Sequence, residues 1–334
     1  MIVANLAHIK AANGMFYYGL DYIAGMADDV RCILVRPTLH GLARQRFPGI
    51  AVKSCSAATW LAEIARARVR DDLLYTPTSH PVAGYRRQVI IVHDRYPFDT
   101  GSRRGRLKRS LLKAAIGLSG CDAGYVNRSD AQPFLCDLGV PQARMFFAPN
   151  RPLLESVVQE RTPGPRRTVG LFGSDSPKKN YAALFEAVAG GDHDMEFLVY
   201  GHDTPYLRTV VAAFPGISIT LVKSDEVGLS PFLAMVDVVG SVAIGEGFGR
   251  PIASALHAGI PCVLLDAPVF REFFDGAAMF SPTIPDFVAQ LAHISCDDAR
   301  SDRFRSVLDG IVASWSDAVL AIRCRDNQTG AVNC

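Results

Sequence analysis

The sequence predicts an α/β fold in which two Rossmann-like domains, each a parallel sheet covered by helices, face each other across a cleft. Short β-branched runs alternate with amphipathic segments along the chain, as they do in βαβ units. The alternation stops at a stretch rich in proline and glycine (Pro149, Pro152, Pro163, Gly164, Pro165) and then restarts. A length of 334 residues suits two domains of roughly 150 residues each.

The first half of the chain, residues 1–150, is expected to form an N-terminal domain. Its clearest strand is residues 89–92, which are four consecutive β-branched residues. The expected strands are residues 2–7, 30–35, 72–75, 89–92, 123–126 and 145–147, and the expected helices are residues 15–27, 59–70 and 106–118.

A second domain is expected over residues 166–305. The expected strands are residues 168–172, 196–200, 217–221, 236–243 and 262–265, and the expected helices are residues 181–189, 230–235, 251–258, 286–293 and 304–322. The C-terminal helical region, 306–325, is expected to pack back on the first domain, and residues 326–334 are expected to form a polar tail.

Charge and cysteine content point to a partner and a compartment. Residues 1–150 hold 20 Lys and Arg against 11 Asp and Glu, and the remainder holds 15 against 22. This asymmetry indicates either an anionic partner for the first domain or mutual attraction of the two domains. The eight cysteines form no Cys-x-x-Cys pair and no zinc spacing, so we expect a reduced, cytoplasmic protein. No basic leader and no apolar run of ~18 residues is found, so any membrane contact is expected to be peripheral.

The most informative segment is the glycine-rich turn Glu246-Gly247-Phe248-Gly249, followed by a helix that begins near Pro251. Proline suits the first turn of a helix, where no N–H is needed. Free N–H groups at a helix start favour an anionic ligand, and the glycines let the backbone approach it. Glu246 stands beside these donors and is expected to accept hydrogen bonds from hydroxyl groups. The alternative is a tight strand-to-helix turn that binds nothing.

Two adjacent lysines, Lys178 and Lys179, open the helix that follows the strand at residues 168–172. Cations at a helix start oppose the helix dipole, and a bound diphosphate would relieve that conflict. A solvated lysine pair is the alternative. In the first domain, His93 and Asp94 close the strand at residues 89–92, where Asp94 is expected to orient the imidazole ring. Taken alone, a histidine at such a position is more often structural.

These segments together resemble the family-4 glycosyltransferases, which have the GT-B fold and retain the anomeric configuration, of the kind acting in bacterial surface polysaccharide assembly. The resemblance covers about residues 1–285 and rests on Glu-Gly-Phe-Gly-x-Pro and on Pro-Lys-Lys-Asn at residues 177–180. It implies that Glu246 and His93 are catalytic residues that meet the donor sugar. It also implies donor binding by Gly14, Lys178, Lys179, Gly247, Phe248, Gly249 and Ser254. Ser254 stands where the family has a second glutamate for the ribose.

The resemblance implies transfer of a hexose from a nucleotide-diphosphate sugar to a glycan or lipid-linked acceptor. No cofactor and no metal are expected, since the two lysines supply the positive charge. Two alternatives stay open: a non-catalytic glycosyltransferase-like subunit, motivated by Ser254, and a sugar-nucleotide epimerase, for which no acid–base set is evident.

A basic run carries Arg103, Arg104, Arg106, Lys108, Arg109 and Lys113, with leucines between the cations at helical spacing. The pattern favours a helix that lies on an anionic membrane surface. No nucleic-acid-binding motif accompanies the run. The alternative is a solvated helix face.

Overall fold

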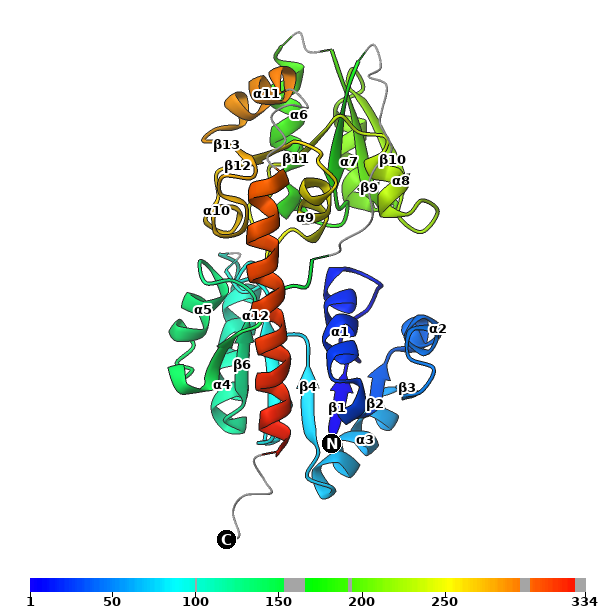
Figure 1. Cartoon of the computed structure of the whole chain (residues 1–334), viewed down its shortest axis with the longest axis vertical. Helices are drawn as coiled ribbons and strands as arrows, with labels where there is room; N and C mark the ends of the chain where they lie inside the picture. The colour runs from blue at the N-terminus through cyan, green and yellow to red at the C-terminus, as the bar shows by residue number, and fades with distance from the viewer. Residues whose placement is uncertain (100, 153–165, 192–193, 295–300, 328–334) are drawn as a thin grey trace. The chain divides into compact units, whose positions relative to one another are not determined.

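A computed structural model describes residues 1–99, 101–152, 166–191, 194–294 and 301–327 (Figure 1). The chain divides into two compact units. Unit 1 comprises Met1–Arg151 with Ile311–Cys334, and unit 2 comprises Pro152–Gly310. Each unit holds one parallel sheet with helices, so the predicted α/β class is confirmed.

Unit 1 contains seven parallel strands in the order β3-β2-β1-β4-β5-β6-β7. The strands are β1 (Ile2–Asn5), β2 (Val30–Val35), β3 (Ala51–Ser54), β4 (Leu73–Thr76), β5 (Gln88–Val92), β6 (Asp122–Tyr125) and β7 (Met145–Phe147). The helices are α1 (Gly14–Gly25), α2 (Pro37–Arg46), α3 (Ala57–Val69), α4 (Arg103–Ser119) and α5 (Ala131–Asp137), with 3₁₀ turns η1 (Ala27–Asp29) and η2 (Gln142–Arg144). The order reverses direction between β1 and β4, which are neighbours.

Both faces of this sheet are covered. Ile2 and Ala4 of β1 belong to a core shared with α1 and α2, whereas Val3 joins a separate core with Ile64 of α3. Strands buried on both faces read as continuous apolar runs, which is why the sequence marks them clearly.

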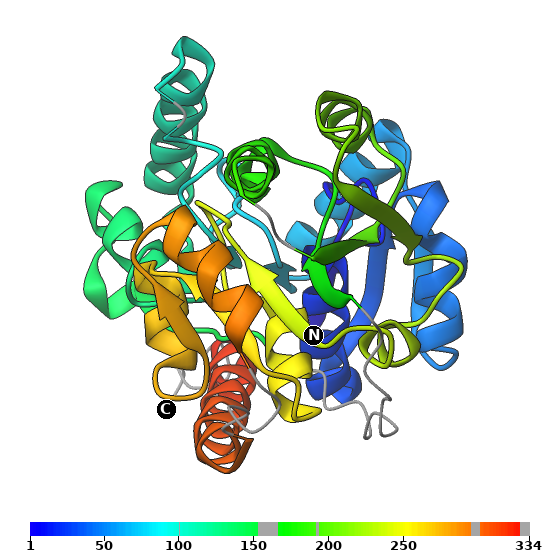
Figure 2. The same cartoon turned by 90° about the horizontal axis from the view of Figure 1, so that it is seen from above.

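Unit 2 contains six parallel strands in the order β10-β9-β8-β11-β12-β13. The strands are β8 (Arg167–Phe172), β9 (Met195–Gly201), β10 (Ser218–Lys223), β11 (Val238–Ser241), β12 (Cys262–Leu265) and β13 (Met279–Ser281). The helices are α6 (Tyr181–Ala189), α7 (Pro205–Ala213), α8 (Leu229–Leu233), α9 (Arg250–His257), α10 (Pro268–Phe274) and α11 (Ile284–His293), with the 3₁₀ turn η3 (Pro177–Lys179). Figure 2 shows strands and helices of this unit from above.

The last helix, α12 (Ser301–Asn327), is drawn in Figure 1 as one continuous helix. From Ile311 onward it belongs to unit 1. There Val319 and Ile322 are buried in the core that contains α1. The guanidinium of Arg325 lies 2.5 Å from a carboxylate oxygen of Asp122 in β6. These contacts hold the end of the chain against unit 1.

Several elements differ from the sequence prediction. Helices α2, α5, α7 and α10 and strands β3 and β13 were not predicted. In α2 only Leu39 and Ala43 are buried, so its sequence carries little apolar periodicity. The strand expected at residues 236–243 spans only Val238–Ser241, because pairing with the neighbouring strands β8 and β12 is limited to these residues. Of the tail expected over residues 326–334, Asp326 and Asn327 belong to α12, and residues 328–334 lie outside the described residues.

The linker expected at residues 163–165 also lies outside the described residues. Within the described part of the chain, none of the helices combines the length and apolarity needed to cross a lipid bilayer.

The substitution Gly25→Ala tests how α12 packs on α1. An added Cβ would lie 2.9 Å from Cγ2 of Val319 and 3.0 Å from Cη2 of Trp315, so neighbouring groups must shift. We expect the free energy of unfolding, measured by urea denaturation, to fall by about 1 kcal/mol or more.

The matched control is Gly41→Ala in α2, where nothing lies within 4 Å of the added methyl group. This change should raise the free energy of unfolding by up to about 1 kcal/mol, because alanine loses less conformational freedom than glycine on folding. Equal effects of the two substitutions would contradict close packing of α12 on α1.

Candidate functional site

In unit 2 the predicted site residues Lys178, Lys179 and Glu246 lie on loops at the point where the strand order of the sheet reverses. Strands β8 and β11 are neighbours, and the chain reaches β11 only after building β9 and β10 on the other side of β8. Their carboxyl ends therefore carry two adjacent loops, residues 173–180 and 242–249. The N–H of Ile244 donates to the carbonyl of Lys178 at 2.9 Å and joins these loops. Open parallel sheets bind ligands at such a point.

Lys179 and Glu246 form an ion pair across the two loops. The ammonium nitrogen of Lys179 lies 2.5 Å from Oε1 of Glu246, and the side chains are 15% and 16% exposed. Gly173 makes the approach possible, because a Cβ there would lie 2.5 Å from Cε of Lys179. Gly173 also has a φ of +85°, which favours glycine. Lys179 is thus paired with Glu246, which is also a predicted site residue. The sequence alone does not identify this pairing.

The pair fixes the charge state of the carboxyl group. Burial alone would raise the pKa of Glu246, but the ammonium groups of Lys179 and Lys178 outweigh it and lower the pKa below its ordinary value. Glu246 is therefore ionised at neutral pH. In the structure it accepts a hydrogen bond from the Lys179 ammonium, and the expected bonds from hydroxyl groups stay a prediction.

The loop that carries Lys178 and Lys179 is held by side chains behind it. The hydroxyl of Tyr181 donates to the carbonyl of Gly173 at 2.6 Å. Ser174 donates to the carbonyl of His202 at 2.6 Å and accepts from the N–H of His202 at 2.9 Å. Sequence reasoning missed both anchors, since neither bond leaves a motif in the sequence and the partner of Ser174 is 28 positions away. These hydrogen bonds tie the loop to α6 and to the end of β9.

The glycine-rich turn ends at the start of α9. Gly249 occupies the N-cap position with a φ of +92°, so glycine is needed there. The ring of Phe248 is buried against Phe273, with centroids 4.7 Å apart. Phe248 therefore anchors the turn through its side chain, and the expected contact of this residue with a donor stays a prediction. Gly247, on the same turn, is half-buried.

Ser254 lies in the second turn of α9, and its side chain is buried. Its hydroxyl donates to the carbonyl of Arg250 at 3.3 Å, one helical turn earlier. The hydroxyl is thus engaged within its own helix, and the expected contact with a ribose stays a prediction.

The predicted residues Gly14 and His93 belong to unit 1. His93 follows β5, and its Nε2 donates to the carbonyl of Pro77 at 3.0 Å, since a carbonyl can only accept. The imidazole ring packs edge-on against Tyr18, with centroids 4.7 Å apart. Gly14 is the first residue of α1, and nothing lies within 4 Å of where its Cβ would be. The orienting role expected for Asp94 stays a prediction.

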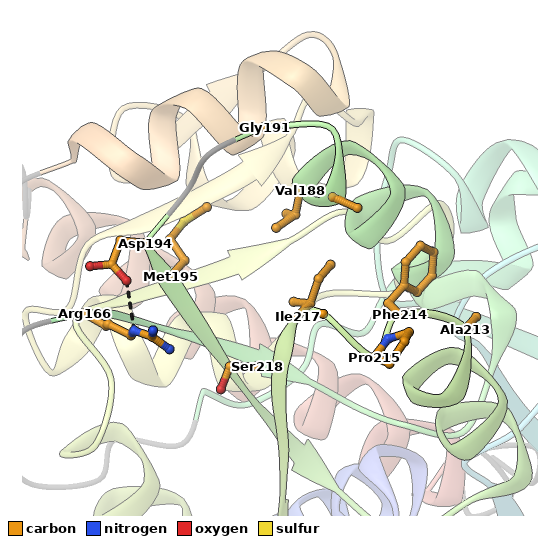
Figure 3. Close-up of a pocket in the computed structure, with 12 residues that line it drawn as sticks. Arg166, Val188, Gly191, Asp194, Met195, Ala213, Phe214, Pro215, Ile217 and Ser218 are labelled. Carbon is orange, nitrogen blue, oxygen red and sulfur yellow. Dashed lines mark ion pairs between the residues drawn. The ribbon is translucent and has the colours of Figure 1, made fainter.

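Figure 3 shows residues that line a groove beside the amino ends of β9 and β10, at the end of the unit 2 sheet opposite the two loops. The groove has a volume of about 740 Å³. Its charged groups are Arg166 and Asp194, an exposed pair with an N–O distance of 2.9 Å. Such surface pairs contribute little, and the groove brings together no catalytic group that the sequence predicts.

Comparison with solved structures shows that the chain has the GT-B fold. HepE of Anabaena, in complex with UDP and glucose, superimposes with a TM-score of 0.72 at 14% identity, over 97% of this chain and 100% of that chain. WaaG, a glycosyltransferase involved in lipopolysaccharide biosynthesis, gives 0.70 at 14% identity, over 96% and 99%. Sucrose-phosphate synthase of Thermosynechococcus elongatus gives 0.74 at 14% identity, over 100% of both chains.

No protein-family model matches the chain, and a search of curated proteins found no match. The predicted GT-B fold is thus confirmed by structural similarity, while membership of family 4 in particular stays a prediction.

A double-mutant cycle tests the Lys179–Glu246 pair. We expect Lys179→Met or Glu246→Gln alone to lower the free energy of unfolding by about 3 kcal/mol, because each single change leaves the partner poorly solvated. The double variant should lose less than the sum, by about 1–3 kcal/mol. Additive losses in urea denaturation would contradict the pair.

The pH dependence provides a second readout. A lowered pKa of Glu246 in the folded state stabilises the protein above the unfolded pKa of about 4.3 and is lost as pH falls through the folded pKa. Wild type should therefore lose this part of its stability on acidification, and Glu246→Gln should not. The matched control is Glu272→Gln, an exchange of the same kind on α10.

Proposed function

We propose that the protein is a glycosyltransferase that moves a hexose from a nucleotide-diphosphate sugar to a glycan or lipid-linked acceptor, with retention and without a metal ion. One observation carries the proposal: a lysine–glutamate pair and a glycine-capped helix meet at the point where the sheet of unit 2 reverses its strand order. The similar structures support it, since HepE is in complex with UDP or UDP-glucose and WaaG is a glycosyltransferase.

The two loops suit the charges of such a reaction. When the glycosidic bond to the nucleotide breaks, negative charge grows on the departing diphosphate. Lys178, Lys179 and the backbone at Gly249 would stabilise that charge, as preorganised donors do. Glu246 and the backbone of Gly247 would hold the hydroxyl groups of the sugar.

The ion pair also implies an exchange of contacts at Lys179 and Glu246 when the donor binds. Without donor, the ammonium of Lys179 is occupied by Glu246. A diphosphate would compete with Glu246 for that ammonium. The hydroxyl groups of the sugar would then replace the ammonium as hydrogen-bond donors to the carboxylate. In this proposal unit 1 serves the acceptor, and His93 and Gly14 contact the donor from that unit.

A non-catalytic glycosyltransferase-like subunit is the second candidate. Its support is Ser254, which replaces a charged residue of the family pattern and bonds to its own helix. Hydrolysis of any nucleotide sugar by the purified protein would argue against this candidate. The epimerase alternative finds no support in the described site.

Lys179 and Glu246 should interact with different parts of the donor, the lysine with the diphosphate and the glutamate with the sugar. We expect Lys179→Ala to weaken UDP binding and to lower turnover roughly 100-fold, because it removes one charge-stabilising donor. Glu246→Ala should keep UDP binding but lose hydrolysis of UDP-glucose or of another accepted donor. Isothermal titration with UDP and a coupled assay of released UDP measure the two effects.

Binding raises the apparent stability of the folded state, so a thermal-shift screen of nucleotide sugars identifies the donor for these assays. The matched control is Lys223→Ala, which removes an exposed lysine at the end of β10 that is paired with Glu226. If Lys179→Ala retained full turnover, or Glu246→Ala lost UDP binding as well, these assignments would be wrong.

We also propose that unit 1 contacts an anionic membrane surface through α4. Leu107, Leu111 and Leu118 recur at positions i, i+4 and i+11 of this helix and are 60%, 61% and 71% exposed. The opposite face of α4, with Leu112 and Ile116, is buried in unit 1.

Cations flank the exposed stripe, chiefly Arg103, Arg104, Arg106 and Lys108, which are all exposed. Arg109 is different, because it lies 3.2 Å from Asp99 and 3.4 Å from Asp137 and so pairs within unit 1. An apolar stripe between cations is the pattern of a helix that lies in the interface of an anionic bilayer.

Vesicle sedimentation tests the role of α4. Wild type should bind vesicles that contain anionic lipid and bind neutral vesicles far less, and binding should weaken once salt shortens the Debye length below ~10 Å. The changes Leu107→Ser and Leu111→Ser together, or Arg103→Gln and Arg104→Gln together, should reduce binding about tenfold or more.

The matched control is Leu61→Ser on α3, because Leu61 is 61% exposed, like Leu111, but lies outside the stripe. It should sediment like wild type. Equal sedimentation of wild type and the α4 variants with anionic vesicles would leave α4 an ordinary solvated helix.

A further inference from the structure

A cluster of rings in unit 1 lies where the strand order of that sheet reverses, between β1 and β4. The rings of His8, which follows β1, and His80, which follows β4, are stacked with centroids 4.9 Å apart and an angle of 12°. Trp60 of α3 meets His8 edge-on, with centroids 5.6 Å apart. Histidine and tryptophan thus converge from three segments on the ligand-binding edge of the sheet.

Hydrogen bonds hold the cluster in place. The indole N–H of Trp60 donates to Oδ1 of Asn5 at 3.0 Å, and Nδ2 of Asn5 donates to the hydroxyl of Thr76 at 3.2 Å. Nδ1 of His80 lies 3.0 Å from the hydroxyl of Thr78. His80 is nevertheless exposed and His8 half-buried, so a ligand can reach both rings.

The charges around the rings are positive. Burial, the His80 ring and the Arg36 guanidinium lower the pKa of His8 to about 4. Partial desolvation of the imidazole ring, whose Nδ1 lies against Thr78, and the ammonium of Lys108 lower the pKa of His80. Arg36 is held there because its Nε donates to the carbonyl of Ala7 at 3.1 Å. The two imidazoles are neutral at pH 7 beside two cations, an arrangement that an anion would stabilise.

We propose that His8, His80 and Trp60 form a subsite for a sugar that carries a carboxylate or a phosphate. Arg36 and Lys108 attract the anionic group, and the imidazole N–H groups donate to it. The half-buried indole of Trp60 supplies an apolar surface for the sugar ring. This inference rests on the proposed function, in which unit 1 serves the acceptor, and it specifies that acceptor as an anionic glycan.

The proposal has a direct consequence for pH dependence. A bound anion favours the imidazolium form of His8 and His80, so binding raises the pKa of both. By linkage, affinity for a sugar carboxylate rises as pH falls through the raised pKa values of the bound state, toward the free-state value of about 4 at His8. Affinity for a neutral sugar should not change in this range.

Histidine NMR on the full-length protein tests the subsite without donor or turnover. Glucuronate and glucose 6-phosphate are the probes, and glucose and inorganic phosphate are the controls. We expect both charged sugars to move the titration midpoints of the His8 and His80 ring resonances to higher pH, and to bind about tenfold more tightly than either control. His40, in the same unit, bonds to the carbonyl of Val52 and is the internal reference that should not move.

The variant His80→Gln should lose about tenfold in affinity for the charged sugars, and His40→Gln should lose none. Movement of His40 equal to that of His8 and His80, or equal binding of glucose and glucose 6-phosphate, would overturn the proposal. Binding of inorganic phosphate as tightly as glucose 6-phosphate would overturn its sugar part.

Failure here and failure of the proposed function can be told apart. If UDP-glucose or another donor is hydrolysed but the rings ignore charged sugars, only the anionic acceptor is wrong. If no nucleotide binds unit 2 while the rings respond, the transferase proposal is wrong and the subsite in unit 1 stands.

Discussion

A carboxylate that is 16% exposed needs a cation within a few ångströms, because leaving one buried charge alone costs about 3–5 kcal/mol. In unit 2 this requirement is met by Lys179, which reaches Glu246 over Gly173, a position where no side chain fits. The same contact joins the loops after β8 and β11. Lys179, expected to open a helix, instead ends the 3₁₀ turn η3 just before α6, and it is paired with a residue 67 positions away.

Both units place their polar groups according to one rule. In each sheet the order of strands reverses beside the first strand, between β1 and β4 in unit 1 and between β8 and β11 in unit 2. The loops at these points diverge, so side chains from both can meet a ligand there. In unit 2 the meeting groups are charged and paired, and in unit 1 they are aromatic and neutral beside cations. This difference fits the proposal that unit 2 binds the diphosphate and unit 1 the acceptor.

The sequence predicts much of this architecture, because buried parallel strands leave unmistakable apolar runs. The strand at 30–35 and the helix at 181–189 have the predicted bounds. Half-exposed elements were missed, as with α2 and the edge strand β3, since their burial is too limited to create a periodic pattern. The glycine-rich turn was visible as a motif. The pairing of Lys179 with Glu246 and the stacking of His8 on His80 were not, because only the fold brings these residues together.

The long helix α12 has a consequence for synthesis on the ribosome. Its last turns complete the core of unit 1, where Val319 and Ile322 are buried with α1, although the rest of that unit is encoded before residue 152. During synthesis, the apolar face of unit 1 that α12 covers therefore stays uncovered until the residues of α12 after Ile311 have been made and have left the ribosome. Unit 2, encoded in between, is complete before the unit that precedes it. Premature termination would consequently damage the first-made unit most and expose the surface on which chaperones act.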